Sequence, residues 1–343
     1  MLLLLLILVL CLVLVKASFC FSGFNPNYLD KNRTNAIKGV FILLIVLSHS
    51  LGYIKDSGYI FTAFGDILFV KFFNLISQLV VVMFLFYSGY GVSESYKKKG
   101  KAYIQTFPQK RILTTLLNFD VAVVLFIILN LCLGVSISLK AGFLSLLGWG
   151  SVGNSNWYIF VILFCYFFSF IVLRIPLKKH ANRVTLLFAL CLLLIVVLSI
   201  YKESWWYNTL MSYPMGFVFS TYKERFEGVF KGRYWFVAVV LVMIFMLFHF
   251  CPNGSLFLPF NIMSITFALL CVLLTMKIDI MCPVLRWFGA HLFPVYIYMR
   301  IPMLYIEHQH PELITTQPTV FILISLVVTV MIASFYRFWQ VKL

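Results

Sequence analysis

The feature that most constrains this chain is a succession of long apolar segments that leaves little room for anything else. Segments of about 20 mostly apolar residues, the length that a helix needs to cross a bilayer, recur along the sequence, and 62% of its 343 residues are hydrophobic. Charged residues make up only 11%, about half of what a soluble globular chain carries. A soluble core cannot absorb so much apolar surface, so the sequence predicts a helical protein that crosses the membrane many times.

The prediction is an all-α transmembrane bundle of about eleven spans, with one extra N-terminal span before ten core spans. They lie at 1–20, 36–54, 66–90, 111–134, 157–173, 183–200, 205–221, 234–251, 257–276, 288–306 and 319–340. The span at 205–221 is the weakest, because Pro214 and Gly216 interrupt it. We expect residues 1–21 to form the extra span and residues 31–343 the membrane domain.

The first apolar segment has a second interpretation, as a secretory signal that is removed from the mature protein. No positively charged region precedes residues 1–15, and residues 17–20 form a poor cleavage site. An uncleaved span is favoured for these two reasons, and a signal-like segment is the alternative.

The basic residues gather in alternate loops between these spans. Only five of the 27 lysines and arginines, namely Lys55, Lys71, Lys140, Lys202 and Arg300, fall on the side opposite to the others. Cytoplasmic loops carry the excess of Lys and Arg, so we expect a multi-pass cell-membrane protein with its N-terminus outside and its C-terminus in the cytoplasm. The net charge of +16 then reflects topology in the lipid bilayer, and no nucleic-acid partner is expected.

The eight cysteines do not have the pattern of a disulfide framework. Five lie inside apolar segments, three lie near span ends, and no pair has a CxxC spacing. We interpret them as small packing residues. The histidines show no metal-ligand spacing either, and no Gly-rich phosphate loop or HExxH motif is present, so no metal is expected.

Ionisable residues at membrane depth are costly, which makes each of them a candidate functional residue. Lys38 and His49 are eleven positions apart in the span at 36–54, which corresponds to about three helical turns and about 16 Å along the axis. They therefore share one face of the helix, with Lys38 at the cytoplasmic mouth and His49 in the outer half of the bilayer. The ordinary interpretation of His49 is a hydrogen-bonded packing residue, and the alternative is a general base.

Several short motifs resemble, in the same order, those of the acyltransferase-3 family of membrane acyltransferases. They are Lys38-x10-His49, the span end Phe84-Leu-Phe-Tyr-Ser88-Gly89-Tyr90-Gly91, the basic segments 96–101 and 108–112, Asn156-Trp157-Tyr158, and Phe288-Gly289-Ala290 followed by Tyr296-Ile-Tyr298. The resemblance covers about residues 31–340 and is specific through the shared order and spacing. Two positions depart from it, because Lys38 replaces an arginine and Lys98-Lys99-Gly100-Lys101 stands where the family commonly has Arg-x-x-Arg.

The resemblance implies an O-acyltransferase. It would transfer acetyl from cytoplasmic acetyl-CoA to a hydroxyl of a surface polysaccharide or a lipid-linked sugar, with His49 as the base that deprotonates the hydroxyl. Positive charge for the CoA phosphates is expected from Lys38, Lys98, Lys101, Lys110 and Arg111. Membrane topology alone also accounts for a basic cytoplasmic segment.

Arg300 is a cation in the outer half of a late span, so it should pair with a carboxylate or line a wet cavity. Glu203, Glu307 and Asp66 are the candidate partners near the outer face. We expect Arg300 in the catalytic cavity, with a structural ion pair as the alternative. Trp157 and Glu203 are expected to bind the acceptor substrate.

The main alternative function is a transporter or flippase for a glycan or another small substrate, since intramembrane charges also form transport paths. Transporters usually contain two related halves with broken helices. Only the stretch around Pro214 predicts such a break, without a counterpart elsewhere. A non-enzymatic membrane scaffold is the third hypothesis.

Overall fold

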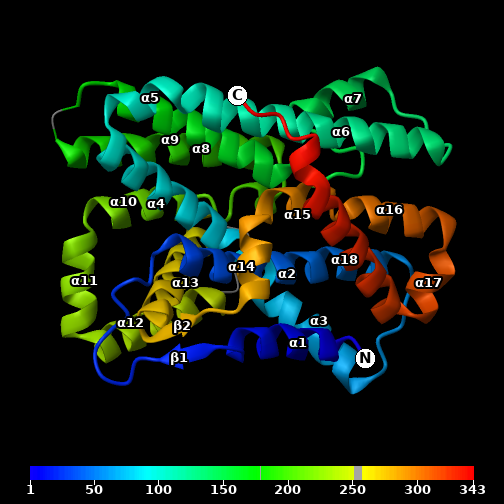
Figure 1. The fold of residues 1–343 in the computed structure, drawn as a ribbon, viewed down its shortest axis with the longest axis horizontal. Coiled ribbons are helices and arrows are strands. Elements are labelled where there is room, and N and C mark those ends of the chain that lie inside the picture. The colour runs from blue at the N-terminus through cyan, green and yellow to red at the C-terminus, as the bar shows by residue number, and fades with distance from the viewer. Residues whose placement is uncertain (178, 251–256) are drawn as a thin grey trace.

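A computed structural model describes residues 1–177, 179–250 and 257–343, and it is a bundle of helices (Figure 1). The longer helices are α1 Leu3–Leu14, α2 Lys31–Asp56, α3 Phe64–Ile76, α4 Val82–Lys99, α6 Thr114–Cys132, α8 Trp157–Arg174, α9 His180–Tyr201, α10 Ser212–Thr221, α11 Lys223–Gly232, α12 Tyr234–His249, α13 Phe257–Lys277, α16 Arg300–Gln309 and α18 Pro318–Phe335. The shorter ones are α5 Lys101–Phe107, α7 Leu139–Leu146, α14 Pro283–Ala290, α15 Leu292–Tyr298 and α17 Pro311–Thr316. Among the described residues the only strands are β1 Ala17–Phe19 and β2 Ile278–Ile280, which pair antiparallel.

Within the described residues, seven helical segments are long and apolar enough to cross a membrane. They are Lys31–Asp56, Phe64–Lys99, Lys101–Cys132, Trp157–Arg174, His180–Tyr201, Leu258–Lys277 and Pro318–Phe338. The pair α11 and α12, which is bent by 103°, makes an eighth if it counts as one span. The helical multi-pass architecture agrees with the prediction, and the count of about eleven spans is not confirmed.

Prolines explain why the expected span at 288–306 is divided into short helices. A proline lacks the N–H that would bond to the carbonyl four residues earlier, so a helix tends to break about one turn before it. Pro294 and Pro302 follow the breaks at His291 and Met299 that separate α14, α15 and α16. Similarly, the expected span at 205–221 is divided between the end of a short 3-10 helix at Ser204–Trp206 and the ten residues of α10, and α1 has only 12 residues. The last residue of the expected span at 234–251 lies outside the described residues.

The basic segment after α4 is more ordered than the loop that its charge pattern predicts. Gly100, with φ +55°, ends α4, and α5 begins at the next residue. A short π-helix at Pro108–Leu113 then joins α5 to α6, so that Lys101–Cys132 is one long helical segment. Positive φ costs a glycine little, which is why the chain can turn there without a longer loop.

Two helix crossings are so close that only glycine fits at each contact point. In the crossing of α2 with α14, a β-carbon on Gly39 would overlap the backbone of Leu285, and one on Gly289 would overlap the backbone of Asn35. In the crossing of α4 with α10, Gly89 and Gly216 stand in the same reciprocal relation to Tyr213 and Phe86. Small residues allow membrane helices to approach closely, and these two crossings fix α2, which carries Lys38 and His49, and α4, which follows the stretch at Ser77–Val81.

The N-terminal segment is tied to the bundle at both of its ends. At one end the carboxylate of Asp66 accepts a hydrogen bond from the N–H of Leu2 at 3.0 Å. At the other, β1 pairs with β2, and Arg33 forms a bidentate ion pair with Asp279 at 2.9 and 2.7 Å. The start of α2 and the end of α13 therefore lie at one end of the bundle, as the alternating distribution of charge requires.

The seven described cysteines form no disulfide with one another. Cys165, Cys191 and Cys282 are buried, as packing residues are, whereas Cys11 and Cys132 are exposed, and Cys251 lies outside the described residues.

Candidate functional site

A cavity of about 470 Å³ opens beside the last turns of α2. Its walls come from α2, the stretch that joins α3 to α4, the loop that precedes α8, and the region of α15 and α16. His49, Trp157 and Arg300, which the sequence predicts for catalysis and substrate binding, all line it. We call it the His49 cavity.

His49 presents its ring to this cavity. No described residue forms a hydrogen bond with its ring nitrogens, although Arg300 is close enough to interact with it electrostatically. A packing histidine would need a hydrogen-bond partner. The ring is therefore placed where it can accept a proton from a molecule inside the cavity.

Arg300 has only neutral partners among the described residues. Its Nε donates to the Tyr53 hydroxyl at 3.3 Å, and Nη1 lies 3.5 Å from the carbonyl oxygen of Asn154. The guanidinium carbon also lies 5.5 Å from the centroid of the Tyr53 ring. Arg300 therefore lines the cavity without a carboxylate to neutralise it.

The three carboxylates predicted as partners of Arg300 have other environments, so the expected ion pair is absent from the described part of the chain. Asp66 accepts hydrogen bonds from Leu2 and Tyr59. Glu203 is exposed and does not line the cavity. Glu307 lies in a neighbouring pocket with Asp56, where burial raises its pKa and the charges of His308 and Arg300 counteract that rise.

The loop before α8 is held in a defined shape by its own polar side chains. Asn156 donates to the carbonyl oxygens of Gly148 and Gly150 at 3.0 and 2.7 Å. Ser151 donates to the carbonyl oxygen of Asn154 at 2.7 Å, and that same carbonyl faces Arg300. The loop thus places Trp157, the first residue of α8, on the cavity wall.

Three polar atoms of the cavity wall lack a well-formed hydrogen bond within the described residues. They are Oε1 of Gln78 and the hydroxyl oxygens of Ser155 and Tyr296. The two hydroxyls lie near each other but without standard hydrogen-bond geometry. Ser77, with φ +40°, interrupts the helix just before Gln78 and directs this stretch toward the cavity. Buried polar atoms usually have a partner, so these atoms are suited to a polar ligand.

The other end of α2 carries the predicted donor-side cations. Because α2 is one unbroken helix from Lys31 to Asp56, Lys38 and His49 lie on a common rigid element, about 16 Å apart along its axis. The Lys38 ammonium lies 3.5 Å from Oδ1 of Asn35 and 5.9 Å from the centroid of the Tyr87 ring. It also interacts electrostatically with Arg111, and within the described chain neither cation has a carboxylate within 4 Å.

The remaining predicted cations are spread over a wider surface. Lys98, Lys101 and Lys110 are exposed, and Lys101 lines a pocket of about 510 Å³ together with Arg174. A second pocket nearby, of about 400 Å³, is lined by Lys97 and Arg183. Lys38 and Arg111 are therefore close enough to interact electrostatically, and Arg111, like Lys98 and Lys110, is exposed at the surface.

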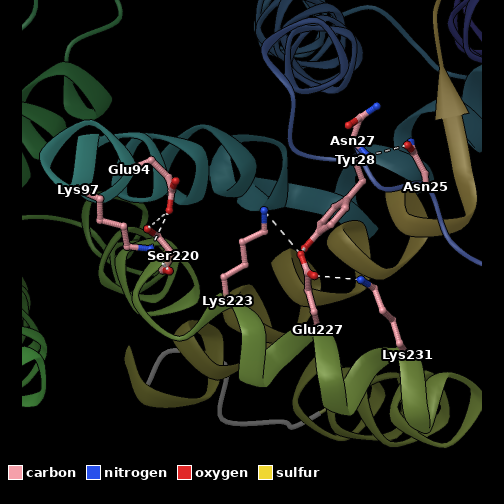
Figure 2. A network of polar contacts seen from close by, with 9 residues as sticks. All are labelled: Asn25, Asn27, Tyr28, Glu94, Lys97, Ser220, Lys223, Glu227 and Lys231. Carbon is pink, nitrogen blue, oxygen red and sulfur yellow. Dashed lines mark hydrogen bonds and ion pairs between the residues drawn. The ribbon is translucent and has the colours of Figure 1, made fainter. Parts of the chain in front are cut away.

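A polar network holds the helices next to this second pocket (Figure 2). Ser220 of α10 donates to Glu94 of α4 at 2.7 Å, and Lys97 contacts both Glu94 and the carbonyl oxygen of Ser220. On α11, Glu227 accepts hydrogen bonds from Tyr28 and Lys231, each at 3.0 Å. These contacts fasten α4, α10, α11 and the segment before α2 to one another.

Several residues of the His49 cavity were missed by the sequence analysis. Lys55, Gln78 and Trp205 line it, and Tyr296 appears in the sequence only as part of a motif without an assigned role. The sequence could have indicated Lys55, because it is one of the five Lys and Arg residues expected on the outer side of the membrane. For Gln78 and Trp205 no sequence signal was available, since they reach the cavity only through the break at Ser77 and the short helix at Ser204–Trp206.

Comparison with known proteins gives one informative match. The family model described as an acyltransferase domain, acyltransferase-3, matches residues 28–337, which is nearly the whole chain. No curated protein and no solved structure matches the chain significantly.

Proposed function

The chain belongs to the acyltransferase-3 family of membrane acyltransferases, and we propose that it transfers acetyl from cytoplasmic acetyl-CoA to a hydroxyl of an extracytoplasmic or lipid-linked surface glycan. The observation that carries this proposal is the position of His49, which faces a polar cavity with its ring nitrogens free of described partners and lies on the same helix as Lys38. The cell membrane is the proposed location, with the Lys38 end of α2 toward the cytoplasm.

In the proposed reaction His49 acts as the general base. It removes the proton from the acceptor hydroxyl while the hydroxyl oxygen attacks the thioester carbonyl. A C–O bond forms and the C–S bond breaks, so that the products are an ester and CoA thiol, which recovers the proton from the imidazolium. The Ser155 and Tyr296 hydroxyls belong to residues of the same cavity wall and are buried without well-formed partners. A hydroxyl that turned toward the oxygen that becomes negative in the transition state would stabilise it.

Lys38 and Arg111 are the proposed contacts of the CoA phosphates. Two cations without a described carboxylate partner form a binding site for a phosphate group, and their mutual repulsion would fall when an anion binds between them. Lys101 and Arg174 extend this basic surface.

Tyrosines fill much of the interior between the two ends of α2. Tyr296 in the His49 cavity contacts Tyr158, with ring centroids 5.4 Å apart. Toward the other end, Tyr166 of the same helix α8 contacts Phe107, and Phe107 contacts Tyr103, which lies near Arg111. These side chains are buried, and the pantetheine arm would have to pass between them to extend from the phosphates to His49.

Thiol release from acetyl-CoA by the protein in vesicles tests the proposal. His49→Ala should lower acceptor-dependent thiol release at least about 100-fold, the usual contribution of a general base, while insertion and the melting temperature stay unchanged. His308→Ala is the matched control, because His308 is exposed and lies outside the cavity. Undiminished transfer by His49→Ala would contradict the role of His49 as the base.

A transporter or flippase is the second candidate, and the divided helices α14, α15 and α16 favour it, because transporters place substrate sites at helix breaks. The same vesicles separate the two functions. A transporter would move a glycan across the bilayer without releasing thiol from acetyl-CoA.

A further inference from the structure

The His49 cavity is positively charged. Lys55 and Arg300 line it, and no aspartate or glutamate among the described residues does. Cations near membrane depth are costly unless they are paired. Lys55 is exposed in the last turn of α2, whereas Arg300 is half-buried, so the guanidinium of Arg300 is the cation that most needs an explanation.

The other three cations on this side of the chain are accounted for in different ways. Lys71 and Lys140 are exposed, as Lys55 is, but they do not line the His49 cavity. Lys202 donates to the carbonyl oxygen of Trp149 at 2.7 Å and lies 4.0 and 4.3 Å from the ring centroids of Trp149 and Trp206. Only Lys55 and Arg300 of these five outer cations face the cavity.

The contacts of these two cations are neutral and long. Lys55 lies 3.5 Å from Oδ1 of Asn74, and Arg300 has the Tyr53 hydroxyl at 3.3 Å and the Asn154 carbonyl oxygen at 3.5 Å. Charge-assisted hydrogen bonds are normally shorter, at about 2.7–2.9 Å. The donors of both side chains are therefore still available to a stronger, negatively charged acceptor.

The nearest carboxylates do not fill this role. Glu307 and Asp56 share the neighbouring pocket with Tyr53, and the charge of Arg300 acts on Glu307 from a distance, but neither carboxylate lies within 4 Å of Arg300. Tyr53, which accepts the hydrogen bond from Arg300, lines this neighbouring pocket, whereas Arg300 itself lines the His49 cavity. The guanidinium remains directed to the His49 cavity.

The rest of the wall suits a carbohydrate. Trp157 and Trp205 provide aromatic surfaces, and Asn74 and Gln78 provide amide groups. Apolar and aromatic walls with a few placed polar groups are typical of small-ligand sites. The polar groups can bind sugar hydroxyls, which leaves Lys55 and Arg300 for an anionic substituent.

We infer that the acceptor is an acidic glycan, whose carboxylate or phosphate group binds Lys55 and Arg300 while the hydroxyl to be acylated lies at His49. This inference rests on the proposed function and adds the substrate class to it. The charge would sit close to the reacting sugar, because His49 and Lys55 are six residues apart on α2, about 9 Å along the helix axis.

Binding and transfer with matched acceptors test this inference. The protein is placed in phosphatidylcholine vesicles, and the acceptors are a uronic-acid oligosaccharide, the same compound with its carboxylates reduced to hydroxymethyl groups, a polyol-phosphate oligomer, and its dephosphorylated form. Binding is followed by tryptophan fluorescence, since Trp157 and Trp205 line the cavity. One acidic member of a pair should bind at least about 10-fold more tightly than its neutral counterpart, and added salt should weaken this binding.

The variants Arg300→Gln and Lys55→Gln should remove this preference, mainly through a higher KM for the acidic acceptor, and Arg300→Lys should restore part of it. Lys140→Gln, which removes an exposed cation on the same side, is the matched control. Equal binding of acidic and neutral acceptors would overturn the inference, and so would binding of neither. An equal fall in kcat for both kinds of acceptor in Arg300→Gln would assign Arg300 to the transition state instead.

The two proposals fail in different ways. Transfer of acetyl to neutral acceptors alone would leave the acyltransferase proposal standing and refute the acidic acceptor. Binding of acidic acceptors without acetyl transfer to any acceptor would refute the proposed function and keep the cavity as an anion site.

Discussion

Gly289 of α14 packs so closely on Asn35 of α2 that a β-carbon at position 289 would overlap the carbonyl group of Asn35. Gly39 stands in the same relation to Leu285 on the other side of this crossing. The contact joins the first turns of the helix that carries Lys38 and His49 to the start of the segment that leads to Arg300. Gly289 belongs to one of the motifs of the family, and the structure explains it as a packing residue.

Gly289→Ala should therefore destabilise the protein strongly. The overlapping atoms are backbone atoms, which cannot turn away, so the cost should reach the upper part of the range of about 1–3 kcal/mol for overpacked sites or exceed it. A thermal unfolding series in detergent measures the effect. Gly91→Ala in α4 is the control, because nothing lies within 4 Å of its added methyl group, and its higher helix propensity should leave the melting temperature equal or raised. Equal behaviour of the two variants would contradict the close crossing.

Lys38→Gln should raise the KM for acetyl-CoA by at least about 10-fold with a smaller effect on kcat, because the variant loses a charged contact to a CoA phosphate. Lys38→Arg keeps the charge and should stay close to the wild type. The comparison is with Lys31→Gln, an exposed cation at the start of the same helix. Initial rates of thiol release over a series of acetyl-CoA concentrations give both constants. An unchanged KM in Lys38→Gln would remove Lys38 from the donor site.

The ion pair between Arg33 and Asp279 should make a measurable contribution to stability. Both partners are largely buried, with side-chain exposures of 21% and 14%, and the geometry is bidentate. A double-mutant cycle with Arg33→Gln and Asp279→Asn should give a coupling free energy of about 1–3 kcal/mol. Asp30, which also lies near Arg33 but is 59% exposed, provides the comparison, and Asp30→Asn should cost well under 1 kcal/mol. A coupling near zero for Arg33 and Asp279 would show that the pair does not fasten α2 to β2.

Tyr28 should make stability depend on alkaline pH. Burial, together with the charge of Glu227 and the hydrogen bond to it, raises the pKa of Tyr28 above its ordinary value. In the unfolded chain a tyrosine loses its proton near pH 10, whereas the folded protein still holds it, so the unfolded state binds fewer protons and stability falls as pH rises. The contribution is complete below about pH 10 and is lost progressively above it. The melting temperature should therefore fall further between pH 8 and pH 10.5 in the wild type than in Tyr28→Phe. Equal falls in the two proteins would contradict the raised pKa.

The sequence predicted the long helices because hydropathy is a local property. A run of apolar residues long enough to cross a bilayer has few alternatives to a helix, and Lys31–Asp56 and His180–Tyr201 lie where the sequence placed them. The breaks were harder to predict. The effect of Pro294 and Pro302 depends on whether neighbouring helices support a kinked continuous span, so apolar content alone gave one span where the structure has three short helices.

The site was predictable where its residues share one helix. Lys38 and His49 are related by helical periodicity, so their common face on α2 followed from their spacing. Glu203 shows the limit of this reasoning. It was expected near the outer face as a substrate-binding residue, yet it is exposed and does not line the cavity, whereas Trp205 does.

By itself the sequence determined the helical membrane class, the family and the alternating distribution of charge, because hydropathy, motif order and loop charge are read along the chain. The tertiary structure decided which polar residues meet. Lys55 lies on the same helix as His49, whereas Arg300, Trp205 and Gln78 come from other elements. Gln78 follows the break at Ser77, Arg300 follows the break before Pro302, and Gly39 and Gly289 let α2 and α14 pack in contact. Gly89 and Gly289 were recognised in the sequence only as parts of family motifs, and the structure shows that each is required by a close helix crossing. Close backbone contact is a property of two helices together, and neither helix encodes it alone.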